Sequence, residues 1–141
     1  MGEFINLEVF HRTANSHAHH PRNMGLSDDF NGHARITGPC GDTMEFWLKV
    51  ENGIIKNASF VTDGCGPSIA SGSMTTCLAK SKTIAEAMRI SQQDVLEALD
   101  GLPEDHAHCA LLAANTLKAA CEDYLSKQKK GGCDGGREKN V

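Results

Sequence analysis

The sequence lacks several features that would assign the protein to common functional classes. It has no apolar run of membrane-spanning length, and its first residues contain neither a signal-peptide core nor a myristoylation motif. Lysine and arginine are scattered until the C-terminal tail, and the formal net charge is -4, so no basic face suited to phosphate binding is expected. We therefore expect a cytoplasmic protein that binds neither a membrane nor nucleic acid.

The chain has six cysteines but no C-x-x-C pair, a common arrangement in zinc sites. In a reducing compartment cysteines more often bind metal or carry out chemistry than form disulfides, so we do not expect three disulfides. A chain of 141 residues with 40% hydrophobic content is large enough to bury a core in one domain without such cross-links. The cysteines are therefore candidates for a functional site.

Residues 44–61 predict a β-hairpin. Over residues 44–50, apolar side chains alternate with a second set that includes Trp47, which is the period of a strand with one buried face. Asn52-Gly53 is typical of a type I′ turn, and a second strand is expected over residues 54–61.

Helices are expected after the hairpin. Small residues that follow Cys65 predict a helix with Pro67 in its first turn. Thr83-x-x-Glu86 and Ser91-x-x-Asp94 are capping boxes that predict two short helices, and apolar spacing from about Ala107 predicts a long amphipathic one. Consecutive strands followed by helices indicate an α+β fold, with a small, mostly antiparallel β-sheet, helices packed on one face and a long C-terminal helix.

The two ends of the chain lie outside this pattern. A short helix is expected over residues 5–11, followed by a polar, histidine-rich stretch to about residue 33, and this N-terminal segment of residues 1–33 is expected to be partly mobile. Residues 127–141 are too rich in lysine and glycine to bury anything, which predicts a disordered tail. The expected domain is therefore residues 1–126.

Three cysteines lie in short motifs that are far apart in the sequence. These motifs are Gly38-Pro39-Cys40-Gly41-Asp42, Asp63-Gly64-Cys65-Gly66 and His106-Ala107-His108-Cys109. The hairpin would place Cys40 and Cys65 at one end of the sheet. Cys109 falls in the first turn of the last helix, where the helix dipole is expected to lower its pKa. Thiolate, imidazole and carboxylate suit borderline-soft cations, so the motifs indicate a metal or cluster site assembled by the fold.

The ligand count leaves the fourth ligand open. A 2Fe-2S cluster normally takes four protein ligands, and Cys40, Cys65 and Cys109 supply three. Asp42 and His108 are the candidates for the fourth, and either would bind iron less tightly than a thiolate does. The same residues also make an acceptable tetrahedral zinc site.

The remaining cysteines and a histidine cluster receive simpler interpretations. Cys77 and Cys121 fall within apolar helical patterns and are expected in the core. Cys133 in the expected tail is interpreted as an exposed, uncoordinated thiol. Residues 17–20 include three histidines, for which solvated side chains in a polar loop are the expected arrangement and metal binding is the alternative.

At these motifs the chain resembles the IscU and NifU N-terminal family of iron-sulfur cluster assembly scaffolds. The family's Asn-Pro-Arg-Asn-x-Gly, Cys-Gly-Asp, Gly-Cys-Gly and His-Cys motifs appear here as His20-Pro21-Arg22-Asn23-Met24-Gly25, Cys40-Gly41-Asp42, Gly64-Cys65-Gly66 and His108-Cys109. The resemblance runs from about residue 20 to about residue 124. It implies a SufE/NifU-like fold and a stand-alone scaffold.

The resemblance also implies roles for the site residues. Cys40, Cys65 and Cys109 would receive sulfur and hold a transient 2Fe-2S cluster, with Asp42 and His108 as exchangeable ligands. Such a scaffold accepts sulfur from a cysteine desulfurase, binds iron and transfers the cluster to apo-proteins, so it is not an enzyme in the turnover sense.

One motif departs from the family pattern. Members that depend on a dedicated Hsp70-type chaperone carry Leu-Pro-Pro-Val-Lys, whereas this chain has Leu102-Pro103-Glu104-Asp105-His106. The difference argues against such a chaperone as a partner.

Two other functions fit parts of the pattern. A zinc-dependent hydrolase or deaminase would use Asp42 or His108 as a general base beside a metal-bound water, although no H-x-E or P-C-x-x-C pairing supports it. A persulfide sulfur-transfer protein would carry sulfur on Cys109. Zinc in the purified protein fits all three functions, whereas anaerobic reconstitution with iron, cysteine and a desulfurase distinguishes them.

Overall fold

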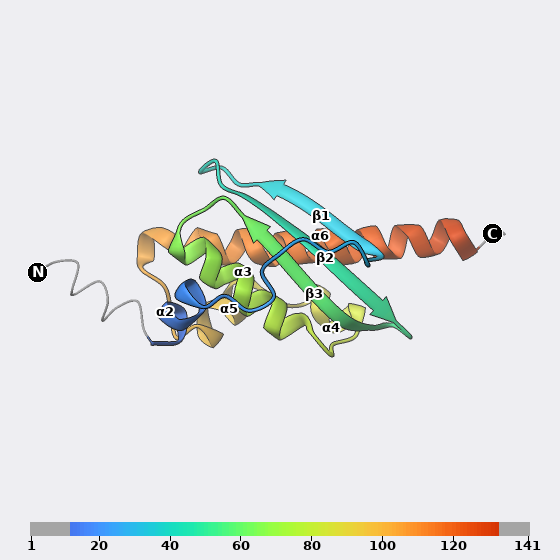
Figure 1. Cartoon of the computed structure of the whole chain (residues 1–141), viewed down its shortest axis with the longest axis horizontal. Helices are drawn as coiled ribbons and strands as arrows, with labels where there is room; N and C mark the ends of the chain where they lie inside the picture. Colours follow the sequence, from blue (N-terminus) through green and yellow to red (C-terminus); the bar gives the residue numbers. More distant parts are fainter. Residues whose placement is uncertain (1–11, 133–141) are drawn as a thin grey trace, which may run out of the picture.

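The computed structural model describes residues 12–132, which form a three-stranded antiparallel sheet in the order β1-β2-β3 with helices on one face (Figure 1). The elements are α2 (Arg12–His19), β1 (Gly32–Thr37), β2 (Thr43–Glu51), β3 (Ile54–Thr62), α3 (Gly66–Ala79), α4 (Ile84–Met88), α5 (Gln92–Ala98), the 3-10 turn η1 (Glu104–His106) and α6 (Ala107–Gly132). Helices α3 and α6 pack on the same face of the sheet and on each other. The predicted α+β fold is confirmed.

The predicted hairpin is formed by β2 and β3. Asn52 and Gly53 have φ angles of 56° and 77°, as a type I′ turn requires. Phe46 and Phe60 face each other across the two strands and are both fully buried. A Cβ atom at Gly72 of α3 would clash with the Phe60 ring, so glycine permits this close approach of helix and sheet.

Helix α6 crosses β1 and β2 and closes the core with Leu117 and Cys121, both fully buried. It continues to Gly132, so the expected disordered tail does not begin at residue 127. An ion pair of 3.0 Å between Lys127 Nζ and Asp123 Oδ2 supports this extension, since charged residues four apart meet on a helix. Residues 133–141, with Cys133, lie outside the described part. Neither α6 nor any other helix within residues 12–132 is long and apolar enough to cross a membrane.

The segment interpreted as partly mobile, residues 1–33, contains α2 and the first two residues of β1, and neither element was predicted. Strand β1 pairs with β2, and α2 packs on α3 with Ala14 fully buried. His17 Nδ1 lies 2.7 Å from Ser73 Oγ, which also accepts a hydrogen bond of 2.8 Å from the Arg22 backbone N–H. From Arg12 onward the segment is therefore docked on the core; the helix expected over residues 5–11 lies outside the described residues.

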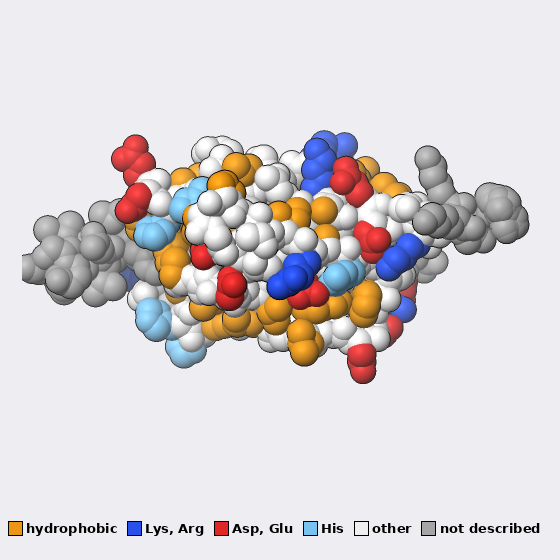
Figure 2. Space-filling view, turned by 90° about the horizontal axis from the view of Figure 1, so that it is seen from above, with side chains coloured by type: hydrophobic (Ala, Val, Ile, Leu, Met, Phe, Trp, Pro, Cys, Tyr) orange, Lys and Arg blue, Asp and Glu red, His pale blue; other side chains and the backbone are white. Residues whose placement is uncertain are grey.

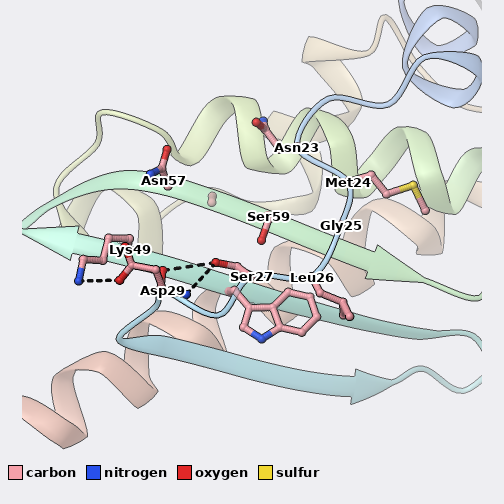
Figure 3. A pocket seen from close by; sticks show the side chains of 11 residues that line it. Asn23, Met24, Gly25, Leu26, Ser27, Asp29, Lys49, Asn57 and Ser59 are labelled. Carbon is pink, nitrogen blue, oxygen red and sulfur yellow. Dashed lines mark hydrogen bonds and ion pairs between the residues drawn. The ribbon is translucent and has the colours of Figure 1, made fainter.

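A strap of residues 23–31 leaves the edge of β3 and crosses the outer face of the sheet to reach β1 (Figure 1). At its start, Phe60 N–H donates to Asn23 O at 3.0 Å and Gly25 N–H donates to Phe60 O at 2.8 Å. Trp47 lies under the strap and is only 7% exposed, although its position in the alternation placed it on the solvent face. A cavity of about 310 Å³ separates the strap from the sheet, and Figure 3 shows Ser59 facing it.

We predict that His17 makes stability depend on pH. Burial and the positive charge of Arg22 lower the pKa of His17, so the unfolded chain takes up a proton below about pH 6.5 that the folded protein resists. The free energy of unfolding should thus fall from about pH 6.5 toward about pH 5 more steeply in the parent than in His17→Gln. Urea denaturation at each pH measures both slopes, and equal slopes would contradict the prediction.

Candidate functional site

The loop between β1 and β2 carries Cys40 and Asp42. It is closed by Gly38 N–H donating to Asp42 O at 2.8 Å and Gly41 N–H donating to Gly38 O at 3.0 Å. Gly41 has a φ of 94°, which glycine adopts without strain. The loop leaves the Cys40 thiol exposed to solvent, while Asp42 is half-buried.

Cys65 lies at the N-cap of α3 and is also exposed. Its carbonyl oxygen accepts a hydrogen bond of 3.0 Å from Ile69 N–H in the first turn. Asp63 Oδ1 accepts a bond of 2.7 Å from Thr43 N–H, which ties the end of β3 to the start of β2. Cys40 and Cys65 are therefore held at the same end of the sheet, as the hairpin predicted.

Gly64 lets the two loops pack against each other. A Cβ atom at this position would lie 2.8 Å from Asp42 Oδ2 and would clash with the side chain of Ser68. Any larger residue would therefore push Asp42 away from the start of α3. Gly64, beside Cys65, therefore leaves the space that the side chains of Asp42 and Ser68 occupy.

Cys109 lies in the first turn of α6, as predicted, and is only 1% exposed. Its sulfur is 3.3 Å from Ser68 Oγ, and the same Oγ is 3.0 Å from Asp42 Oδ2. His108 is exposed, with Nε2 at 3.9 Å from Cys109 Sγ. The site thus gathers residues from the β1–β2 loop, the start of α3 and the start of α6.

Ser68 was missed by the sequence analysis. It stands three positions after Cys65 and is fully buried in the first turn of α3. A polar residue one turn along the helix from Cys65 was the available signal, because such a residue faces the same side as the helix start.

The pKa of Cys109 differs from the expectation. The first helical turn was expected to lower it, but burial raises the pKa of the Cys109 thiol to about 11. The hydrogen bond from Ser68 acts in the opposite direction, and the nearby Cys65, Asp42 and Cys40 add to the rise. Burial disfavours the thiolate more strongly than the positive end of the helix dipole favours it, so the metal-free Cys109 is protonated near neutral pH.

The candidate ligands do not yet surround a common point. Among residues 12–132, no three side chains of histidine, cysteine, aspartate or glutamate are arranged to hold a metal ion together. Cys40 and Cys65 are exposed, whereas Cys109 is buried. Figure 2 shows acidic and histidine side chains near the end of the molecule where α6 begins; Glu104, Asp105 and His108 are exposed there.

Within residues 12–132, the two cysteines outside the motifs are a core residue and a surface residue. Cys121 is fully buried, as predicted, whereas Cys77 is exposed and its expected core position is wrong. Helix α3 is buried over much of its surface because it packs on β3, α2, α5 and α6, so its apolar pattern did not reveal that Cys77 faces solvent.

Among the histidines of residues 17–20, the expected solvated side chains are found for His19 and His20, which are exposed, but not for His17, and the expected loop is helical up to His19. His17 is buried against Ser73 within α2, and His19 Nδ1 lies 2.9 Å from Asn15 O. His20 follows the helix and is exposed. The three side chains thus take different surroundings, and they belong to no metal-holding group of the part of the chain described by the structure.

Fold and site together define a small α+β domain with three cysteine motifs at one end. The model of the NifU-like N terminal domain family matches residues 9–131, and this chain belongs to that family. An iron-sulfur cluster assembly scaffold protein, IscU 1 of Archaeoglobus fulgidus, is 44% identical over 115 residues, covering 81% of this chain and 75% of the relative. The scaffold protein IscU of Escherichia coli is 42% identical over 118 residues, covering 80% and 91%.

A solved structure agrees with the fold. The N-terminal part of a nitrogen-fixing NifU-like protein from Brucella abortus superposes with a TM-score of 0.67 at 16% identity, covering 85% of this chain and 96% of that chain. The likeness at this identity supports the fold alone.

We predict that the described cysteines differ in reactivity in the metal-free, folded protein. Cys40, Cys65 and Cys77 should react rapidly with iodoacetamide because they are exposed. Cys109 and Cys121 should react slowly, since they are buried and a pKa rise from 9.0 to about 11 at Cys109 lowers its thiolate fraction about a hundredfold. Peptide mass spectrometry after timed quenching measures each rate. Urea-unfolded protein, in which all rates should converge, is the control, and a Cys77 as slow as Cys121 would contradict its exposed position.

Proposed function

We propose that this chain is a scaffold on which a 2Fe-2S cluster is assembled and from which it is transferred to apo-proteins. The observation that carries the proposal is the approach of three separate segments, bearing Cys40, Cys65 and Cys109, to one end of the sheet beside Asp42. The names of the relatives, which are scaffold proteins, support this function and give no support to the hydrolase or persulfide-transfer alternatives.

In this proposal the three cysteines are thiolate ligands of the cluster, which is cargo that arrives and leaves. Asp42 is favoured as the fourth ligand because its half-buried carboxylate already shares the Ser68 hydroxyl with Cys109, whereas the His108 side chain is exposed to solvent. A carboxylate holds soft iron less firmly than a thiolate does. Weak fourth ligation suits a protein that must release its cluster. Zinc in the purified protein remains a prediction that fits the same donors.

Sulfur is proposed to come from the persulfide of a cysteine desulfurase. A scaffold thiolate attacks the outer sulfur of the persulfide, and the donor cysteine leaves as a thiolate. Each transferred sulfur must then gain two electrons to become the bridging sulfide, which a separate reductant supplies. Cys40 and Cys65 are exposed, so a donor can reach them without unfolding of the site. We propose that the scaffold itself is not an enzyme, because it holds the cluster and releases it and does not turn over a substrate.

The surface next to the site bears on the choice of partners. Glu104 and Asp105 in η1 are exposed and put negative charge where chaperone-dependent family members carry Pro-Val. We infer that a dedicated Hsp70-type chaperone does not recognise this segment.

Removal of any one site cysteine should reduce cluster assembly by more than about tenfold, because the loss of a first ligand exceeds the usual effect of an outer partner. The variants are Cys40→Ala, Cys65→Ala and Cys109→Ala, and the matched control is the exposed Cys77→Ala. Visible absorbance after anaerobic reconstitution with iron and sulfide reports the yield. Full assembly on Cys109→Ala would remove that residue from the ligand set.

Asp42→Ala should leave sulfur acceptance intact but produce a longer-lived cluster that transfers slowly to an apo-ferredoxin, because the variant lacks the weak carboxylate ligand at which an incoming thiolate competes for the iron. The decay of the chromophore and the transfer rate are compared with those of the parent and of Asp28→Ala, an exposed aspartate on the strap. A zinc hydrolase with Asp42 as general base would instead lose catalysis without change in cluster lifetime. Parental decay and transfer would exclude Asp42 from the mechanism.

A further inference from the structure

Ser68 is the one buried serine of α3 whose hydroxyl contacts two proposed ligands at once. Its Oγ lies 3.0 Å from Asp42 Oδ2 and 3.3 Å from Cys109 Sγ. Ser71, also fully buried, donates instead to Pro67 O of its own helix at 2.8 Å. Ser73 bonds toward α2. A serine hydroxyl inside a helix commonly turns back to the backbone in the way that Ser71 does, so the orientation of Ser68 toward the site is a distinct arrangement.

The contacts of the Ser68 hydroxyl link side chains from three separate elements. Asp42 comes from the β1–β2 loop, Ser68 from α3 and Cys109 from α6. A serine hydroxyl has one hydrogen and two acceptor positions, so it donates to either the carboxylate or the sulfur while remaining within reach of the other. The bare Cα of Gly64 leaves the space in which Asp42 and Ser68 meet.

We propose that Ser68 is a positioning residue that holds the Asp42 carboxylate beside Cys109 in the metal-free protein and so presents the two ligands to iron as a pair. The proposal rests on the proposed function, in that Asp42 and Cys109 are taken as ligands. Without the hydroxyl, the half-buried Asp42 side chain is free to turn toward solvent. Metal binding then has to order this side chain, which lowers the affinity.

Cobalt(II) titration of the metal-free protein under reducing conditions tests this role without any assembly activity, since cobalt–thiolate absorption reports binding directly. Ser68→Ala should weaken Co²⁺ binding about tenfold, the lower end of the usual effect of an outer partner. Ser71→Ala removes an equally buried hydroxyl from the same helix and should bind Co²⁺ as the parent does. Parental affinity in Ser68→Ala, together with weakened binding in Asp42→Ala, would overturn the proposal.

A double variant tests whether Ser68 acts through Asp42. In the Asp42→Ala background, Ser68→Ala should cause little further loss of affinity, because the side chain that it positions is already absent. If Ser68→Ala lowers the Co²⁺ affinity by the same factor with and without Asp42, the positioning role is overturned. Thermal unfolding of the metal-free variants accompanies each titration.

Should Ser68→Ala unfold at a clearly lower temperature than Ser71→Ala, a further variant is needed. In that case Ser68→Thr, which keeps the hydroxyl, shows whether the loss of Co²⁺ affinity comes from the hydroxyl or from lower stability. Parental Co²⁺ affinity in a folded Ser68→Thr supports the proposal, and affinity as weak as that of Ser68→Ala overturns it. Failure of the proposed function gives a different result: neither Asp42→Ala nor Cys109→Ser would then change Co²⁺ binding.

Discussion

The packing of α6 across the sheet is the constraint on which the site depends. A Cβ atom at Gly32 of β1 would lie 2.8 Å from Ala120 O, so the helix backbone rests almost directly on the strand. Leu117 and Cys121 fill the adjoining core. Because a helix is a stiff rod, this contact also sets the position of its first turn, where Cys109 lies. The core of the sheet and the geometry of the site are therefore parts of one arrangement.

The site combines thiols with opposite surroundings. Cys109 is buried and protonated when no metal is present, whereas Cys40 and Cys65 are open to solvent. In the proposed scaffold role, a cation that binds Cys109 displaces a proton, whereas the exposed pair would accept sulfur or iron from a partner at little structural cost. In that role the exposed Cys40 and Cys65 would take up sulfur or iron from solvent, and the buried Cys109 would be the fixed ligand.

The parts of the fold that were predictable are those specified by neighbouring residues. The turn at Asn52-Gly53 and the capping boxes at Thr83 and Ser91 are local, and all three are present. Strand β1 and helix α2 depend on contacts with distant residues, such as that between His17 and Ser73, so periodicity did not reveal them.

The site was predictable in its motifs but not in its environment. Sequence spacing placed Cys109 in a first helical turn, yet its pKa follows from burial, which only the packed structure gives. Cys77 lies on the solvent side of a helix that is apolar nearly all around, and Ser68 is one of several small polar residues in it. In both cases the composition of the helix concealed which way a side chain faces.

The strap also covers part of the β3 edge, where another strand could pair with the sheet. A free strand edge offers unpaired N–H and C=O groups to any extended chain, which is a route to aggregation and to strand exchange. Here Asn23 and Gly25 occupy those groups at Phe60, and the φ of 146° at Gly25 turns the strap away at once. The segment is too short to offer a new edge in its place. A partner that adds a strand to β3 at Phe60 must therefore first displace the strap.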